Sequence, residues 1–313
     1  MKRILSIAGL CVLFCGNVRA ADNTPLTIAI MPLENLSGAS EYDGLRDGLA
    51  DGLRTGLEGK KGIRVLERSQ LAGVMAEQKL AMTGLVDART AAGVGKLLGA
   101  KFLLTGSFFV FENRIRASLK FVDVASGRID LDRTIVADDD KDKALEMAGK
   151  LAAKVDEALR KQSPAADSAV KPCRIAILPF ANNMKQAEYD GIGPFEAEAL
   201  ATALARRADI DVVERAQLQK VVAELKLGAS GAVDNATAAQ IGKLQGANYL
   251  LLGSYSILGG KAQIVAKFVT TETGEVGALP SQQVVGKLDD LFSVTDQLAD
   301  KIAKALTIED RKK

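Results

Sequence analysis

The sequence predicts an α/β protein made of two tandem copies of one domain, each copy a mixed β-sheet flanked by helices. Three observations carry this prediction. The chain matches itself at a single offset, each copy opens with a short apolar run typical of a strand buried on both faces, and helical and alternating patterns follow in the same order in both copies. With 313 residues the chain is long enough for two ordinary hydrophobic cores.

The internal repeat has an offset of 147 residues and needs no gap. At this offset residues 27–32 (TIAIMP) align with 174–179 (RIAILP), and residues 41–44 align with 188–191, both EYDG. The period is far longer than the roughly 20 to 50 residues of solenoid repeats. Each copy is therefore expected to be a domain with its own core.

A polar stretch rich in small residues separates the two copies. Residues 163–172 include Pro164 and end at Pro172, a composition that predicts a flexible linker. The first domain is therefore expected at residues 21–162 and the second at 173–313. We expect each domain to fold on its own.

Within each copy the hydrophobic period predicts the elements in order. A strand, a helix and a second strand form a crossover unit with parallel pairing, two more helices follow, and period-two alternation then marks a β-hairpin. A short strand and a last helix close the copy. In the first copy the expected elements are strand 28–33, a helix carrying Leu45, Leu49, Leu53 and Leu57, strand 63–66, helix 71–82, a helix capped by Asp87, strand 102–111, turn 112–114, a return strand from Ile115 and helix 145–159; their counterparts in the second include strands 175–180 and 210–213 and helix 292–306.

The first 20 residues have the three parts of a secretory signal. Lys2 and Arg3 give a positive start, an uncharged apolar run follows, and small residues precede an expected cleavage between Ala20 and Ala21. The run is shorter than the roughly 20 residues needed to span a bilayer. We therefore expect an exported, periplasmic protein that meets a membrane only through its partners or, as the less favoured alternative, through a lipid anchor on a cysteine of the signal.

Composition excludes several classes of function. Removal of the signal leaves 38 basic and 39 acidic residues, a formal net charge of −1, and the chain contains no tryptophan, so a nucleic-acid partner is not expected. The sequence has no histidine, which removes the usual general base and the commonest metal ligand. Cys173 is the one cysteine left after export, so no internal disulfide can form. We expect no enzyme, no metal and no other cofactor.

Two sequence features are candidate interaction or structural sites. Four glycines spaced by four residues share one face of the first expected helix; either they let this helix pack closely on its own sheet, the favoured interpretation, or they form a seam for another subunit. A Glu-Arg pair follows the second strand of each copy, at the sheet edge where α/β proteins tend to bind ligands. Either the arginines contact an anionic or peptide ligand, or an ion pair ties the strand end to the next helix, which is the favoured interpretation. The residues are Gly44, Gly48, Gly52 and Gly56, and Glu67, Arg68, Glu214 and Arg215.

The longest shared motifs resemble one known family. Residues 65–68 (VLER), 83–87 (TGLVD) and 95–107 (GKLLGAKFLLTGS), with 213–215 (VER) and 242–254 (GKLQGANYLLLGS) in the second copy, are similar to CsgG-type proteins, which include relatives with TolB N-terminal-like domains. The resemblance implies a periplasmic domain that binds protein partners or assembles into homo-oligomers, with no catalytic residues.

This resemblance gives the expected function. We expect a non-enzymatic interaction or assembly module in envelope assembly or protein secretion, as an accessory of curli-type transport. The alternatives are a TolB-like or LpoB-like regulator of an envelope enzyme such as a cell-wall synthase, or a subunit of an outer-membrane secretion pore. The gapless repeat leaves no room for the inserted transmembrane hairpins of the curli component, which argues against the pore.

Overall fold

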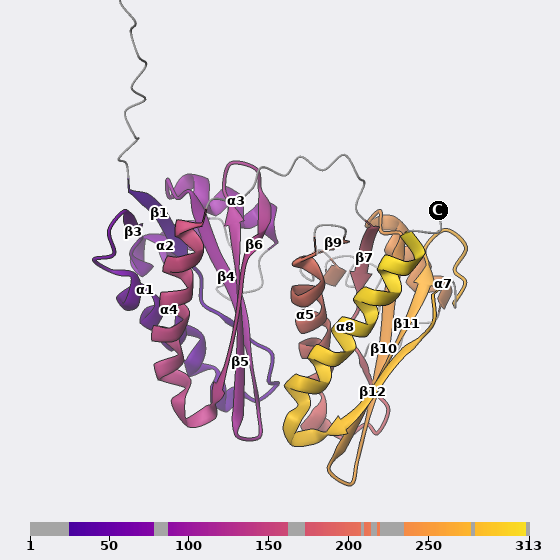
Figure 1. Ribbon diagram of the computed structural model, residues 1–313. Helices are drawn as coiled ribbons and strands as arrows, with labels where there is room; N and C mark the ends of the chain where they lie inside the picture. Colours follow the sequence, from indigo (N-terminus) through magenta and orange to yellow (C-terminus); the bar gives the residue numbers. More distant parts are fainter. Residues whose placement is uncertain are drawn as a thin grey trace, which may run out of the picture.

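The computed structural model describes residues 25–77, 87–161, 173–207, 210–213, 218–219, 235–276 and 279–310. Three features expected from the sequence lie outside these residues: the signal segment with its Ala20–Ala21 junction, the linker 163–172, and the pair Glu214–Arg215. Within the described residues the chain forms two α/β domains, each a mixed sheet flanked by helices, as the sequence predicts (Figure 1).

The first copy contains a mixed sheet built around its longest hairpin. The early strands pair in parallel with one another and with the first strand of the hairpin, and antiparallel pairing joins the two hairpin strands and the strand that follows them. The strand order is β3 (Ile63–Val65), β1 (Leu26–Ile30), β4 (Phe102–Phe111), β5 (Arg114–Asp123) and β6 (Arg128–Asp140), with β2 (Glu34–Asn35) paired to β4. β6 is longer than the short strand expected, because it pairs along β5 on both sides of a bulge at Leu119 and Phe121.

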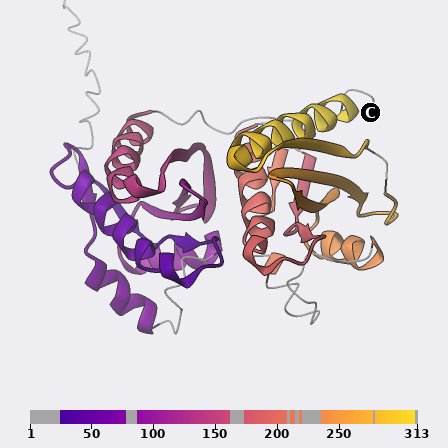
Figure 2. The ribbon, with the colours of Figure 1, turned by 90° about the horizontal axis from the view of Figure 1, so that it is seen from below.

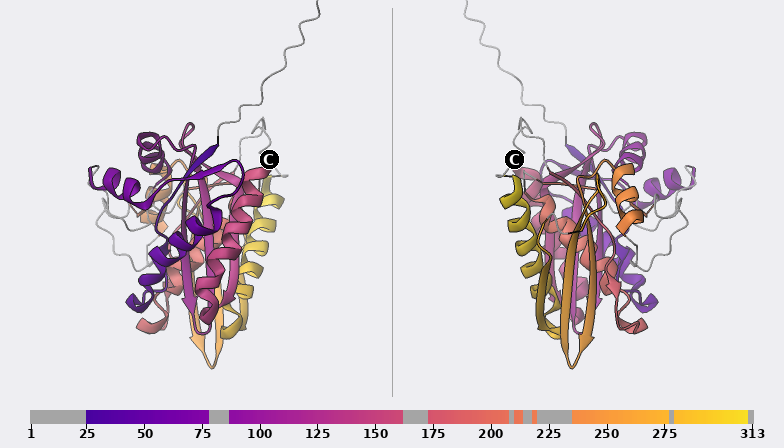
Figure 3. Two further views of the ribbon diagram at one scale, coloured as in Figure 1. Left: turned by 90° about the vertical axis from the view of Figure 1, so that its left-hand side faces the viewer. Right: turned by 90° about the vertical axis from the view of Figure 1, so that its right-hand side faces the viewer.

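The second copy repeats this topology. Its strand order is β9 (Ile210–Val212), β7 (Cys173–Ile177), β10 (Tyr249–Leu258), β11 (Lys261–Thr270) and β12 (Gln282–Lys287), with β8 (Ala181–Asn182) paired to β10. The tight hairpin turns predicted from the sequence are present in both copies, with Glu112 at φ 50° in the first and Gly259 at φ 57° in the second. The β10–β11 hairpin extends past the lower end of the neighbouring elements (Figure 3).

Two helices cover one face of each sheet, and shorter helices cover the upper part of the other face. In the first copy the two long helices are α1 (Gly44–Leu57) and α4 (Ala144–Arg160), and the shorter helices on the other face are α2 (Arg68–Glu77) and α3 (Ala88–Leu97). In the second copy they are α5 (Ile192–Ala205) and α8 (Leu291–Asp310), then α7 (Asn235–Leu244). As expected, Asp87 caps α3, accepting a hydrogen bond from the Thr90 backbone N–H at 3.1 Å.

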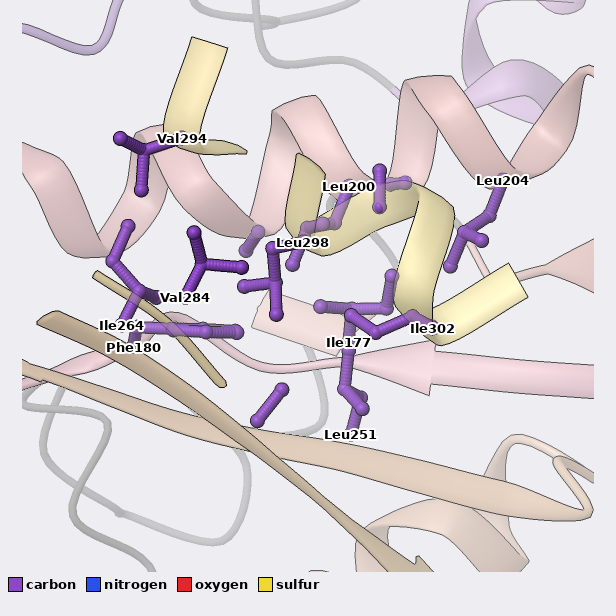
Figure 4. Packing of buried hydrophobic residues seen from close by; sticks show 14 of the residues in the cluster. Ile177, Phe180, Leu200, Leu204, Leu251, Ile264, Val284, Val294, Leu298 and Ile302 are labelled. Carbon is purple, nitrogen blue, oxygen red and sulfur yellow. The ribbon is translucent and has the colours of Figure 1, made fainter. Parts of the chain in front are cut away.

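The main core of each copy lies between its sheet and its pair of long helices. Alternation along β5 sends Ile115, Ala117, Leu119 and Phe121 to this side, where all four are buried. In the second copy, Leu200 of α5 and Leu298 of α8 meet residues of the strands below them (Figure 4). Burial of each such side chain contributes about 1.5 to 3 kcal/mol, which makes these helices the main support of the sheets.

The two copies pack against each other in a head-to-tail arrangement. The long helices of the second copy lie on the outer face of the first sheet, so that the layers run helices, sheet, helices, sheet (Figures 1 and 2). Leu36 and Phe109 of the first copy belong to the same apolar cluster as the core of the second copy. The domains are therefore in direct contact, although the sequence suggested only a flexible connection between them.

Candidate functional site: the interface between the copies

The face of the first sheet that looks away from α1 and α4 forms the contact between the copies. Along β4, Phe108 and Val110 point into the core of the first copy, and alternation therefore sends Phe109 and Phe111 to the other side. There Phe109 lies in one cross-strand row with Arg116 of β5 and Asp138 of β6. This row is covered by α5 and α8.

An aromatic cluster stands at the centre of the interface. The ring of Phe109 stacks on Phe195 of α5 with centroids 4.2 Å apart and planes 14° apart. Phe292 of α8 completes the cluster, 5.4 Å from Phe195 and 6.3 Å from Phe109. Phe109 is only 2% exposed, so the second copy buries it as fully as a core residue. Packed aromatic pairs contribute about 0.5 to 1.5 kcal/mol beyond the area they bury.

Arg116 holds the polar half of the interface together. Its guanidinium donates hydrogen bonds to Asp138 of its own sheet at 2.6 and 2.7 Å and to Asp296 of α8 at 2.8 and 2.9 Å. It also lies 4.7 Å from the centroid of the Phe292 ring. Burial alone would lower the pKa of Arg116, but the bonds to the two aspartates outweigh burial and raise the pKa. The charge is thus fixed between the two copies.

Two glutamates of α5 behave differently at this interface. Glu198 forms an ion pair with Lys120 of β5. Glu196 is fully buried and accepts a hydrogen bond from the Thr295 hydroxyl at 2.6 Å, while its other oxygen, Oε2, has no hydrogen-bond partner in the described part of the chain. Burial raises the pKa of Glu196 to about 8, and the hydrogen bond from Thr295 and the nearby charge of Arg116 only partly offset this. Glu196 is therefore largely protonated near neutral pH.

The glycines predicted as a seam lie on α1, and two of them pack against another helix. A Cβ added at Gly52 would come within 2.5 Å of the Ala148 Cβ, and one at Gly56 within 2.6 Å of the Ala152 Cβ. The partner is therefore α4 and not the sheet, which corrects the favoured interpretation. The reason is that the leucines of α1, including Leu49 and Leu53, occupy the face turned to the sheet.

Gly44 and Gly48 have a different setting. A Cβ at Gly48 would make an ordinary contact with Leu145 at 3.7 Å, and nothing lies within 4 Å of one at Gly44. Both glycines lie toward the open side of α1, away from the interface between the copies. Packing within the described chain accounts for Gly52 and Gly56 but not for Gly44.

Glu67 and Arg68 lie apart from the interface. Both are exposed, and Arg68 forms ion pairs with Asp47 at 2.9 Å and Asp51 at 3.2 Å, both on α1. Arg68 is itself the first residue of α2, so these ion pairs tie the start of α2 to the preceding helix α1, and not the strand end to the next helix as expected.

The residues at the interface were not singled out from the sequence, although two signals point to them. Phe109 and Phe111 are apolar at positions where alternation predicts a solvent-facing side, and the aligned residues in the second copy are Ser256 and Leu258. Helix α5 is apolar around most of its circumference, and residues on nearly every side of it are buried. A helix of this kind is buried on both sides, which predicts a second partner besides its own sheet.

The described residues contain no group of three or more His, Cys, Asp or Glu side chains placed to hold a metal ion. Among them there is also no helix with the length and apolar character needed to cross a membrane. Cys173 lies in β7 and is partly buried.

The fold and this interface define a class of proteins with paired α/β domains joined by a buried contact between the domains. The family model described as curli production assembly/transport component CsgG matches residues 18–135 and 157–276, one segment in each copy. The chain therefore belongs to the CsgG family. Membership of this family indicates an envelope-associated protein.

Several solved structures are similar to one part of the chain. They are the LpoB C-terminal domain from Salmonella enterica (19% identity, 39% of this chain and 87% of that chain, TM-score 0.28), the lipoprotein GNA1162 from Neisseria meningitidis (16% identity, 43% and 99%, TM-score 0.32) and a PelC dodecamer from Paraburkholderia phytofirmans (14% identity, 44% and 90%, TM-score 0.27). No curated protein matches the chain in sequence.

Proposed function

We propose that this chain is an exported, periplasmic module that binds protein partners during envelope assembly or protein secretion and carries out no catalysis. One observation carries the proposal. The outer face of the first sheet holds a helix pair of a second domain through a buried aromatic cluster and a buried arginine. This face of the domain is thus suited to docking protein.

The second copy offers the matching face of its own sheet to a partner. Leu258 is 77% exposed and Val285 is 56% exposed, both on the side of the sheet away from α5 and α8. Exposed apolar side chains grouped on one face are typical of surfaces that bind other proteins. Family membership supports the setting in the envelope.

Site-specific crosslinking in living cells tests the proposal. A photoreactive amino acid at position 258 or 285 should crosslink to an envelope protein, and the mature chain should be recovered from the periplasmic fraction with Ala21 as its first residue. The matched controls are positions 97 and 244, two exposed leucines that are equivalent in the two copies and lie on α3 and α7. Recovery of the chain in the cytoplasmic fraction, or equal crosslinking at all four positions, would contradict the proposal.

A further inference from the structure

Each sheet ends on its antiparallel side in an outer strand with a single neighbouring strand. β6 closes the first sheet beside β5, and β12 closes the second sheet beside β11 (Figure 1). An outer strand presents a row of backbone N–H and C=O groups that no neighbouring strand uses, and such a row can pair with a strand of another protein. The two copies differ in how this row is occupied.

Side chains close the outer strand of the first copy to further pairing. Lys154 of α4 donates a hydrogen bond to the Val136 carbonyl at 2.7 Å. The Asp139 carboxylate accepts a hydrogen bond from the backbone N–H of Asp140 at 3.0 Å. Aspartates fill all of positions 138–140, and charged side chains on an outer strand oppose the addition of another strand.

The outer strand of the second copy keeps a free stretch of backbone. The Leu288 N–H donates a hydrogen bond to the turn between β10 and β11 at 2.9 Å. Alternation along β12 therefore points the backbone groups of Gln283, Val285 and Lys287 to the free edge. Lys301 of α8 occupies the Gln283 carbonyl at 2.8 Å. The N–H and C=O of Val285 and the N–H of Lys287 make no hydrogen bond within the described part of the chain.

The charges beside this edge also differ between the copies. In the first copy Arg114 of β5 faces Asp140 of β6, a pair of opposite charges. The equivalent pair in the second copy is Lys261 and Lys287, both exposed and both positive. Like charges directly opposite each other on neighbouring strands are destabilising, and neither lysine forms an ion pair with a described residue. An acidic residue on an added strand would offset this repulsion.

An apolar side chain stands next to the lysines. Val285 is 56% exposed and lies two residues from Lys287, so the two side chains share the outer face of β12. The equivalent residue in the first copy is Asp138, whose carboxylate is bound by Arg116. The free edge of β12 thus offers an apolar contact and a positive charge at alternate positions.

We propose that the free edge of β12 binds an extended segment of another envelope protein as an added strand, and that this segment carries an acidic residue two positions from an apolar one. This deepens the proposed function, on which it rests, by naming the chemistry of the partner. The backbone of Val285 and Lys287 supplies the hydrogen bonds, and the side chains at alternate positions supply the specificity. Lys301 ends the free stretch at Gln283, so the added strand is short.

Peptide binding to the purified mature chain tests this inference. The probe is the labelled peptide Thr-Glu-Thr-Val-Thr-Glu-Thr with blocked ends, whose outward face presents the same pattern in either strand direction. The control peptide has lysine in place of both glutamates. Fluorescence anisotropy should show the glutamate peptide binding about tenfold more tightly than the control, because its carboxylates meet Lys261 and Lys287. High salt should reduce this difference.

Variants at the edge show whether binding uses the strand backbone. Val285→Pro removes an N–H that points away from β11, so the sheet should stay intact while binding of the glutamate peptide is lost. Val285→Thr keeps the N–H and the β-branched shape and should bind like the wild type. Lys287→Glu gives Lys261 an opposite charge and should remove the preference for the glutamate peptide. Unchanged circular dichroism and melting temperature should show that each variant is folded.

Amide hydrogen exchange locates the added strand. In the complex the amide protons of Val285 and Lys287 should exchange more slowly, whereas those of Val284 and Gly286, which point to β11, should be unchanged. The inference would be overturned by a glutamate peptide that binds no better than the lysine peptide, that binds Val285→Pro as well as the wild type, or that protects neither amide. If position 285 still crosslinked to an envelope protein in that case, the proposed function would stand without strand addition.

Discussion

The two copies share one topology but use their surfaces differently. In the first copy, the outer row Phe109, Arg116 and Asp138 is covered by a neighbouring domain, whereas in the second the row Ser256, Gln263 and Val285 is open. The backbone pairing of these rows is the same, so the difference lies in the side chains. All three residues of the row differ between the copies, and only the row of the first copy has the aromatic ring and the arginine that hold a neighbouring domain.

The helix pairs differ in the same way. Gly52 and Gly56 let α1 lie close to Ala148 and Ala152 of α4. The second copy has alanine at both glycine positions, Ala199 and Ala203, and Thr295 opposite the first of them. Real Cβ atoms do not approach within 3.0 Å of each other, so alanine at both positions keeps α5 and α8 further apart than α1 and α4. The wider pair presents Phe195 and Phe292 to the ring of Phe109.

Removal of the central aromatic ring should have the largest effect. Phe109→Ala should lower the free energy of unfolding of the full chain by about 3 to 5 kcal/mol, since it empties a buried site and ends the stack with Phe195. Urea unfolding followed by circular dichroism measures this change. Ser256→Ala alters the equivalent open position and should change stability by less than about 0.5 kcal/mol.

A double-mutant cycle assigns the effect of Phe109 to the contact between the copies. Phe109→Ala and Phe195→Ala together should cost less than the sum of the two single changes, because both remove the same stack. Additive losses would mean that the two copies do not touch at this point. The outer sheet face of the first copy would then be no more covered than that of the second.

Most of the fold could be predicted from the sequence, and the contact between the copies could not. The hydrophobic period is a local pattern, and the repeat appears when the sequence is compared with itself. The order of strands and helices and the presence of two domains therefore follow from the sequence alone. The contact between the domains depends on which surface residues of one domain pack against which surface residues of the other. A single sequence shows only that Phe109 is apolar where alternation predicts a polar residue. The glycine spacing likewise marked a close approach of α1 without naming α4 as its partner.

A buried acid distinguishes the second helix pair from the first and should make stability depend on pH. Glu196 stands where the first copy has Leu49. Its folded-state pKa of about 8 lies above its ordinary value of 4.5, so the native state binds more protons between these pH values. The free energy of unfolding is therefore greatest near pH 4.5 and falls by a few kcal/mol as the pH rises to about 8.

Glu196→Gln should flatten this pH dependence. The amide stays neutral and can still accept the hydrogen bond of Thr295, so the variant should match the wild type near pH 5 and be more stable near pH 9. Urea unfolding at both pH values measures the difference. Glu272→Gln changes an exposed glutamate of the same copy and should leave the slope as it is. A wild-type slope retained in Glu196→Gln would show that another group titrates.

The glycine contacts of the first helix pair predict an intermediate effect. Gly52→Ala should destabilise the chain by about 1 to 3 kcal/mol, because the new methyl group meets Ala148 and the resulting overpacking exceeds the gain in helix propensity. Gly73→Ala on α2, where nothing lies within 4 Å of the added atom, should stabilise by about 0.5 to 1 kcal/mol. Thermal unfolding compares the two. Equal stabilisation by both changes would contradict the close approach of α1 and α4.

The smallest effect is expected at Arg68, which forms exposed ion pairs with Asp47 and Asp51. The positions of Asp47 and Asp51 are occupied by Pro194 and Glu198 in the second copy, and Glu198 already pairs with Lys120. Arg68→Ala should lower the free energy of unfolding by less than about 1 kcal/mol, because its pairs are exposed and screened by salt. Urea unfolding at low and high salt measures this, and the loss should shrink at high salt. Arg68→Ala could instead leave stability unchanged at both salt concentrations but reduce crosslinking to an envelope partner. That result would make the Glu67-Arg68 pair a binding site, and the aligned pair Glu214-Arg215 would be a candidate for the same role.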